Sequence, residues 1–312
     1  MNKLLCLLLL FLASCYRVPD RLDPRVSYQL QDRHFDHLAG AFSPLAPAEK
    51  ASDWGKEYII ARAFANELDL YRAVSTFKRA EILISDNQDR KLEIQYGIVL
   101  CFFLGQRYDE AVEAFEKSDL AHVDKTFPAY HDLLLVLYES YRELDDKEKQ
   151  ARILELIDKA FPDTGEELKV SIAIREGDLS TINHFASGFQ HASYLDNLTD
   201  NYASQKKSVG KAQLLNAFIP GAGYLYLGQR TSALTAFLLN GIFIAAATEF
   251  FIHDHLAAGI ITAGFEAGWY FGGIYGAGLE AKYYNERLYE KSASTVLNEH
   301  KLFPVLMLKH SF

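Results

Sequence analysis

Two long apolar segments near the C-terminus dominate the hydrophobic pattern of the chain. Residues 231–252 carry a single charge, Glu249, and residues 256–279 carry a single charge, Glu266. As an α-helix, each segment is long enough to cross a hydrocarbon layer of about 30 Å. Only the polar residues 253–255 separate the two segments. The pattern therefore predicts two antiparallel transmembrane helices joined by a tight turn.

The rest of the chain has the periodicity of helices rather than strands. Residues 52–177 contain long stretches with apolar residues every three or four positions, separated by short polar breaks. Residues 178–210 indicate a helical connector, residues 211–291 a membrane hairpin domain, and residues 292–312 a C-terminal tail. We therefore expect an all-α protein in which helical repeats precede a two-helix transmembrane hairpin.

Two stretches of residues 52–177 resemble tetratricopeptide repeats. In each, a small residue is followed four positions later by phenylalanine and three positions after that by another small residue. This spacing packs the second helix of a repeat onto the first. The two phenylalanines lie 38 positions apart, whereas that family repeats at about 34. The difference implies longer helices or a longer loop, and a generic helical bundle is the alternative. The residues expected to pack the repeats are Ala73, Phe77, Ala80, Ala111, Phe115 and Ser118.

The first 51 residues have the pattern of a lipoprotein leader followed by a tether. Residues 1–15 comprise a short basic start, an apolar core and the sequence Leu-Ala-Ser-Cys that ends at Cys15. This sequence resembles the lipobox of bacterial lipoproteins, in which the cysteine is acylated and the chain is cut before it. An ordinary secretory signal is the alternative. Residues 16–51 hold four of the eight prolines and show no sustained periodicity, as expected of a tether.

A glycine-rich turn precedes the first apolar segment and carries a second resemblance. Pro220, Gly221 and Gly223 interrupt any continuous helix there. With the motifs in residues 236–241 and 265–276, they resemble the Pro-Gly-x-Gly-x-x-Tyr-x-Gly pattern of a largely uncharacterised bacterial family of two-helix membrane domains. In that family the hairpin follows helical repeats, and some members are fused to a membrane-protein insertion efficiency factor. The resemblance implies a hairpin of this type and, by association, a role in membrane-protein biogenesis.

Four glycines line one face of the second apolar segment. Gly264, Gly268, Gly272 and Gly276 recur at every fourth residue, a spacing that lets another helix approach closely. We expect this glycine stripe to be a helix-packing face, either against the first segment or in self-association. At about 100° per residue, Glu266 points nearly opposite. The stripe and Glu266 therefore cannot both face the first helix, which implies a second helix or subunit for one of them.

Asn240 and Glu266 are the polar residues expected inside the membrane. The two residues lie at similar distances from the 253–255 turn. A carboxyl in a transmembrane segment usually faces protein, water or a partner. A hydrogen bond between Glu266 and Asn240 is the first interpretation. A proton-linked or ligand-binding role for Glu266 and a contact with another protein are the alternatives.

Composition argues against several classes of function. The formal net charge of −9 opposes a nucleic-acid partner. Cys101 is the only cysteine that follows Cys15, and it lies in an apolar run. The body of the protein therefore has no intramolecular disulfide and no cysteine-rich metal site, and we expect Cys101 to be a small core residue.

Two groups of histidines could be mistaken for sites. His253 and His255 flank Asp254 in the turn between the apolar segments, but three residues rarely suffice for a metal ion. His131 and Asp132 are adjacent, and we expect them to be a pair on a helix surface rather than a catalytic dyad. No hydrolase, phosphate-binding or zinc-protease motif is present. We therefore expect no metal, no cofactor and no enzymatic activity.

The sequence carries two conflicting signals of topology. The positive-inside rule places basic flanks in the cytoplasm, whereas an acylated Cys15 is made on the outer face of the inner membrane. We favour export, because the leader acts first during synthesis. Both flanks and Phe312 are then extracytoplasmic. The basic residues that flank the hairpin are Lys206, Lys207, Lys211, Arg230, Lys282, Arg287 and Lys291.

The patterns together predict a lipid-anchored and membrane-embedded protein of the bacterial cell envelope, with the choice between inner and outer membrane left open. Its partners are the lipid membrane and proteins bound by the helical repeats, with self-association through the glycine stripe as a further partner. The predicted function is that of a non-enzymatic scaffold or adaptor. The alternatives are a component of membrane-protein insertion or envelope assembly, and a small transporter or channel subunit that uses Glu266.

Overall fold

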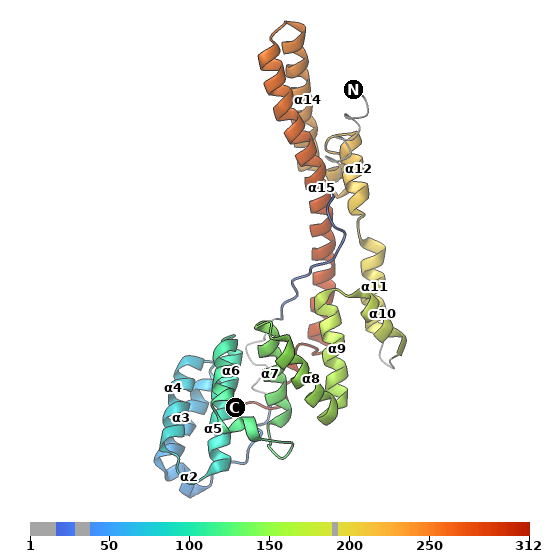
Figure 1. Ribbon diagram of the computed structural model, residues 1–312. Coiled ribbons are helices and arrows are strands. Elements are labelled where there is room, and N and C mark those ends of the chain that lie inside the picture. The colour runs from blue at the N-terminus through green and yellow to red at the C-terminus, as the bar shows by residue number, and fades with distance from the viewer. Residues whose placement is uncertain (1–16, 29–37, 189–192) are drawn as a thin grey trace. The chain divides into compact units, whose positions relative to one another are not determined.

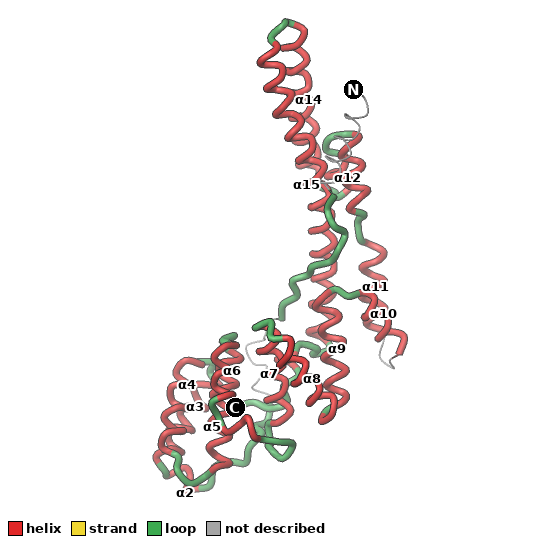
Figure 2. Tube along the Cα trace, in the orientation of Figure 1, coloured by secondary structure: helices red, strands yellow, loops and turns green. Residues whose placement is uncertain are grey.

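The computed structural model describes residues 17–28, 38–188 and 193–312. Helices and short connections make up these residues, and none of them forms a strand beyond one isolated bridge between Gly40 and Ser311 (Figure 2). The prediction of an all-α protein is confirmed. The chain divides into two compact units. The first unit combines the chain up to Val26 with Ala173–Thr295, and the second combines Ser27–Ile172 with Val296–Phe312.

The second unit is a row of antiparallel helix pairs in which each helix contacts the next along the chain (Figure 1). A short helix leads into the row, and a 3-10 turn lies between the second pair and the third. In chain order the elements are α2 (Pro47–Ala51), α3 (Asp53–Asn66), α4 (Leu70–Leu83), α5 (Gln88–Leu104), α6 (Tyr108–Glu116), η2 (Asp119–His122), α7 (Tyr130–Glu143), α8 (Lys147–Ala160) and the beginning of α9 (Pro162–Glu176).

The same three-residue turn joins the helices of each pair. Its middle residue has a positive φ, which is 57° at Leu68, 56° at Gln106 and 55° at Asp145. The next residue in each turn donates its N–H to a carbonyl of the preceding helix at 2.9 Å. This is the Schellman arrangement that ends many helices. Three helix pairs with one repeated turn constitute a structural repeat, whatever its family.

The residues expected to pack the repeats lie between the helices, although not all to the same depth. Ala73, Phe77, Ala80 and Ala111 are buried, whereas Phe115 and Ser118 are half-buried. The ring of Phe77 lies against Gly97 of α5, where a Cβ atom would approach it to 3.0 Å. The spacing of 38 residues is accommodated by the 17-residue α5 and by the long connection between α6 and α7.

The C-terminal tail packs against the second unit rather than leaving it. Ser311 donates its N–H to the carbonyl of Ala39 at 3.1 Å, and Arg62 donates a hydrogen bond to the carbonyl of Phe312. The side chain of Phe303 is fully buried. Residues 296–312 are therefore part of the repeat structure, although they are separated from it by the whole of the first unit in sequence.

The first unit contains the two long C-terminal helices. Its elements are the end of α9, then α10 (Leu179–Gly188), α11 (Ser193–Gln205), α12 (Val209–Phe218), α13 (Ala222–Tyr226), α14 (Arg230–Ile252) and α15 (Leu256–Glu299). The helices α14 and α15 run side by side from a three-residue connection (Figure 1). Because α15 continues without a break to Glu299, the second apolar segment and the charged stretch after it form one helix.

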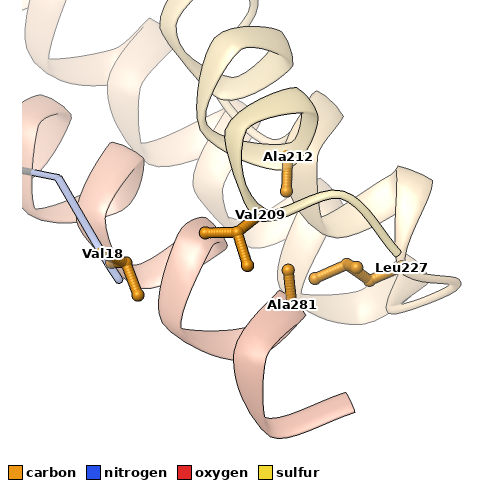
Figure 3. Packing of buried hydrophobic residues seen from close by; sticks show 5 residues of the cluster. All are labelled: Val18, Val209, Ala212, Leu227 and Ala281. Atoms are coloured by element: carbon orange, nitrogen blue, oxygen red, sulfur yellow. The ribbon is translucent and has the colours of Figure 1, made fainter. Parts of the chain in front are cut away.

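The segment after residue 16 is packed where the prolines predicted a tether. Val18 is 3% exposed and forms a small core with Val209, Ala212, Leu227 and Ala281 (Figure 3). Further along this segment, backbone N–H groups donate to carboxylates of α15, from Asp23 to Glu286 at 3.3 Å and from Arg25 to Glu290 at 2.7 Å. The described part of the segment, residues 17–26, therefore belongs to the first unit.

Candidate functional site

The turn at Pro220 and Gly221 is held by side chains whose polar atoms replace water. Asn216 is 2% exposed, and its Oδ1 accepts a hydrogen bond of 2.8 Å from the N–H of Gly221. The hydroxyl of Tyr270 in α15 donates to the carbonyl of Ala217, near the end of α12. Irregular backbone is tolerated at membrane depth only where its polar groups are satisfied within the protein. This turn meets that condition.

Two glycines in the turn are required by the closeness of the surrounding helices. Gly221 has a φ of 93°, and a Cβ atom there would overlap the carbonyl of Ala233 in α14. A Cβ atom at Gly223 would overlap the carbonyl of Ala212 and lie 2.8 Å from the Cβ of Ala277. The Pro-Gly-x-Gly motif thus lets α13 fit tightly against α12, α14 and α15.

The opposite faces of α15 carry Glu266 and the glycine stripe, as the helical geometry predicted. Glu266 is 9% exposed and lies on the buried face with Gly273 and Ala277. On the other face, a Cβ atom added at Gly264, Gly268 or Gly272 would have no atom of the described chain within 4 Å. Within a single chain, these three glycines pack against nothing.

Gly276 differs from the other members of the stripe because a Cβ atom there would overlap the hydroxyl of Tyr224. At Gly273, a Cβ atom would approach Nδ2 of Asn216 to 3.2 Å. Gly273 had no expected packing role, yet it lies on the face that contacts the rest of the unit. The glycine spacing alone does not distinguish a face that packs within the chain from a face that is open.

The hydrogen bond expected between Glu266 and Asn240 does not form. Asn240 is 3% exposed, and its Nδ2 donates to the carbonyl of Ala236 in its own helix at 2.6 Å. Oδ1 of Asn240 and both carboxyl oxygens of Glu266 are buried with no hydrogen-bond partner among the described residues. Buried polar groups are normally paired. Three unpaired acceptors in the middle of one helix pair therefore need an explanation.

A groove of about 610 Å³ runs between α14 and α15. One wall is formed by Gly268, Gly272 and Gly276 of the stripe with Trp269, and the other wall includes Thr235 and Asn240. The unpaired oxygen of Asn240 therefore belongs to a residue that lines this groove. The groove is open along its length, so its occupant is not another part of the described chain.

The outer surfaces of both helices are strongly apolar. Large side chains such as Leu238, Ile242, Ile260 and Phe265 are each more than half exposed. Among the described residues, α14 is the one helix whose length and mean hydropathy of 1.7 suffice for a membrane span, and 11% of that window is buried. The structure therefore supports membrane association through α14, and α15 has the exposed apolar surface without the same mean hydropathy.

The second unit has a groove of about 350 Å³ along α4, α5 and α6. Ile98 and Phe102 supply apolar surface, and Glu81, Glu113 and Lys117 lie among the charged residues around them. A groove of this kind can receive an extended or helical segment whose apolar residues enter it and whose charges meet the rim.

A second concavity, of about 640 Å³, adjoins a buried ion network. Arg90 contacts Glu49 at 3.0 Å and Glu93 at 2.6 Å, and it donates to the carbonyl of Ser43 at 2.9 Å. The hydrogen bond from Arg90, followed by that from the N–H of Ala46, lowers the pKa of Glu49. Because Arg90 is engaged with these groups, we regard the network as structural.

The pair His131 and Asp132 was expected on a helix surface, and this prediction is wrong. His131 is 6% exposed and Asp132 is completely buried. Asp132 contacts Nδ1 of His131 at 2.7 Å and accepts hydrogen bonds from the N–H groups of Lys309 and His310. Nε2 of His131 lies 3.1 Å from Oγ1 of Thr164. The cluster ties the C-terminal tail to α7, and the buried Thr164 hydroxyl leaves no room for a substrate.

The remaining predicted positions carry no evident chemistry. His253, Asp254 and His255 form the exposed connection between α14 and α15, and no group of three or more potential metal ligands occurs among the described residues. Cys101 is 1% exposed, and burial raises the pKa of its thiol, so it is an unreactive core residue. Cys15 and the rest of the predicted leader lie outside the described residues.

Comparison with known proteins identifies no relative, because the chain matches no family model, no curated protein and no solved structure. The function must therefore be inferred from the chain itself. Sequence reasoning missed the roles of Asn216, Tyr270 and Asn285. Asn285 holds Lys207 by two hydrogen bonds, at 2.7 Å to its N–H and at 2.8 Å to its carbonyl. A lone asparagine in an apolar run is the signal that could have pointed to Asn216.

Proposed function

We infer that this protein is a membrane-anchored, non-enzymatic adaptor of the bacterial cell envelope. In this proposal, a lipid on Cys15 and the hairpin formed by residues 231–252 and 256–279 hold the protein in the membrane. The helical repeats, which we regard as tetratricopeptide-like, bind a segment of a partner protein. Their residues lie on the same side of the membrane as Cys15.

The exposed apolar surface of the helix pair α14 and α15 is the observation that carries the membrane part of the proposal. Soluble proteins rarely expose a continuous apolar patch of this extent, because water makes it a site of association. Leu234, Ile242, Ile260, Ile261 and Phe265 are each more than half exposed. Lipid tails would cover these side chains. The glycines of α15 lower its mean hydropathy without adding charge.

The satisfied turn at Pro220 gives further support. A soluble helix–turn–helix can leave turn groups to water, but here Asn216 and Tyr270 supply the partners. The basic residues Lys207 and Lys211 lie near Tyr226, with ammonium-to-ring distances of 5.1 and 5.0 Å. Lysine and tyrosine are typical of the region where a membrane protein meets the headgroups. This end of the unit therefore suits the membrane surface.

The groove of the second unit supports the adaptor part of the proposal. Helical repeats commonly bind partner segments along such surfaces. A photo-reactive amino acid at position 117 in intact cells tests this use of the groove, with position 147 as the matched control. Lys117 lines the groove, whereas the equally exposed Lys147 lies at the start of α8. We expect a discrete adduct from position 117 alone. Equal adducts from both positions, or none, would contradict the adaptor function.

An alkaline wash of isolated membranes tests the anchor. We expect wild-type protein and Cys15→Ala to stay in the membrane pellet, because a spanning hairpin is held independently of the lipid. Release of Cys15→Ala by the wash would show that the lipid is the only anchor and that the hairpin does not span the bilayer.

A role in membrane-protein insertion or envelope assembly is the second candidate, and the open groove between α14 and α15 favours it. In that case the partner would contact the hairpin rather than the repeats. A photo-reactive residue at position 268 distinguishes the two candidates. Adducts to diverse newly made membrane proteins from position 268, without a discrete adduct from position 117, would favour the insertion role.

A further inference from the structure

The groove between α14 and α15 combines two features that a lipid tail cannot satisfy together. Its glycine wall offers close backbone approach, and its opposite wall contains the buried, unpaired Oδ1 of Asn240. An acyl chain would fill the space, but it has no hydrogen-bond donor. The natural occupant of this groove therefore carries an N–H or O–H group on an otherwise apolar surface, which is the description of a transmembrane helix.

This chain carries such a donor beside the same groove. Trp269 is 50% exposed, lines the groove, and has an indole N–H that can only donate. Trp269 lies 14 residues after His255, and Asn240 lies 13 residues before His253. The two side chains are therefore at matching depths below the turn. All copies of a hairpin inserted in one membrane share one orientation, so the Trp269 of one copy meets a second copy at the level of Asn240.

We propose that a second copy of this chain docks into the groove, with a twofold axis running along it. Each glycine stripe then packs against the partner's α14, and the indole N–H of each Trp269 donates to Oδ1 of Asn240 in the other copy. The contact is isologous, as in most homodimers. It rests on the proposed function in one respect, because it requires the hairpin to lie in a membrane.

The stripe is well suited to this docking because it is free in a single chain. A larger side chain at Gly264, Gly268 or Gly272 meets no atom of the described chain within 4 Å. Gly268→Leu should therefore preserve the fold of each copy and still fill the groove. Small residues promote helix association in membranes because lipid offers no hydrophobic drive between helices and close contact must supply the attraction.

Thiol crosslinking in native membranes tests the dimer. The full chain carries Cys101→Ser with either Gly268→Cys at the groove or Gly241→Cys on an exposed face of α14, where the added side chain also meets no atom of the described chain. A short bifunctional thiol reagent should yield a crosslinked dimer from Gly268→Cys and little from Gly241→Cys. Equal yields, or no dimer from either, would overturn the proposal.

The hydrogen bond has its own test, made by energy transfer between labelled copies of the full chain in lipid vesicles. Trp269→Phe keeps the ring and removes the donor, and Asn240→Leu removes the unpaired acceptor. Each should weaken dimerisation by about three- to tenfold, the usual range for one such bond between membrane helices. The double variant should be no weaker than either single one. Unchanged dimerisation in both single variants would overturn the assignment of Trp269 to Asn240.

The alkaline wash separates failure of the dimer from failure of the proposed function. Protein that stays in the membrane pellet but remains monomeric overturns only the dimer. Protein that the wash removes overturns both, because a groove outside the bilayer would be open to water, which would satisfy Asn240.

Discussion

Oδ1 of Asn216 accepts a hydrogen bond of 2.8 Å from the backbone N–H of Gly221, and both groups are buried. Asn216→Ala would leave that N–H without a partner. Because an unsatisfied buried donor costs about 1–3 kcal/mol, we expect the midpoint of thermal unfolding to fall in detergent micelles. The control is Asn201→Ala, which removes an exposed side chain on α11. Equal stability of the two variants would show that Asn216 does not hold the turn.

Gly273 and Gly268 should respond differently to leucine. At Gly273 a Cβ atom already lies 3.2 Å from Nδ2 of Asn216, whereas at Gly268 it meets nothing in the described chain. Gly273→Leu should destabilise the single chain by about 1–3 kcal/mol through overpacking, and Gly268→Leu should leave it nearly unchanged. The stripe alone predicted the reverse order. Unfolding of dilute protein in detergent, where dimers dissociate, measures the difference, and greater damage from Gly268→Leu would refute it.

Asp132 should control the attachment of the C-terminal tail. Its carboxylate accepts hydrogen bonds from the N–H groups of Lys309 and His310, at 3.0 and 2.9 Å. Asp132→Ala removes these acceptors and should cost roughly 3–5 kcal/mol, the range for breaking a buried charged cluster. Limited proteolysis should then cut the tail many times faster than in wild type. Asp124→Ala, in an exposed loop, is the control and should leave the tail protected.

The stability of the first unit should fall at alkaline pH in a defined window. Burial, with smaller contributions from Asp20 and Glu286, raises the pKa of Tyr202 to about 12. In the unfolded chain a tyrosine ionises near pH 10. The contribution of Tyr202 is therefore complete below about pH 10 and is lost as the pH rises to about 12. Near-ultraviolet absorbance should show a late-ionising phenol that Tyr202→Phe removes. An unchanged titration curve in that variant would exclude Tyr202 as its source.

The flanks of the hairpin should lie outside the cytoplasm. Reporters active only in the periplasm, fused after Gln205 and after Phe312, should both be active. The reason is that the leader directs export before the basic flanks are made. Cys15→Ala should block acylation and lipoprotein-type cleavage, as seen by gel mobility and by labelling with a fatty-acid analogue. Cytoplasmic reporter activity at both fusion sites would refute the lipoprotein assignment as well as the topology.

Periodicity predicted the helices well, because it depends on local side-chain spacing. The segment 231–252 corresponds to α14, and the apolar positions of residues 52–177 correspond to the helix pairs. The pairing of distant segments was not predictable in this way. Val18 packs on Val209, and Asp132 binds the chain 177 residues later. These contacts depend on tertiary proximity, which leaves no periodic signal in the sequence.

The polar residues of the helix pair show the same limit more sharply. Matching depth in the sequence correctly placed Glu266 and Asn240 near the middle of the two helices, but depth does not fix the orientation of a side chain. Asn240 donates to its own helix instead. The glycine spacing likewise identified a bare face, and only the packed structure shows that most of this face is open and that Gly273 carries the internal contact.

The burial of Val18 has a consequence for movement between membranes. The chain is fixed to the base of the helix pair only three residues after Cys15, so an acyl group on that cysteine could not act as a free leash. Lipid and hairpin would enter one leaflet within a few residues' reach of each other. A carrier that lifts a lipoprotein out by its acyl chains would have to withdraw both helices at the same time. The protein would then remain in the membrane where it was first inserted.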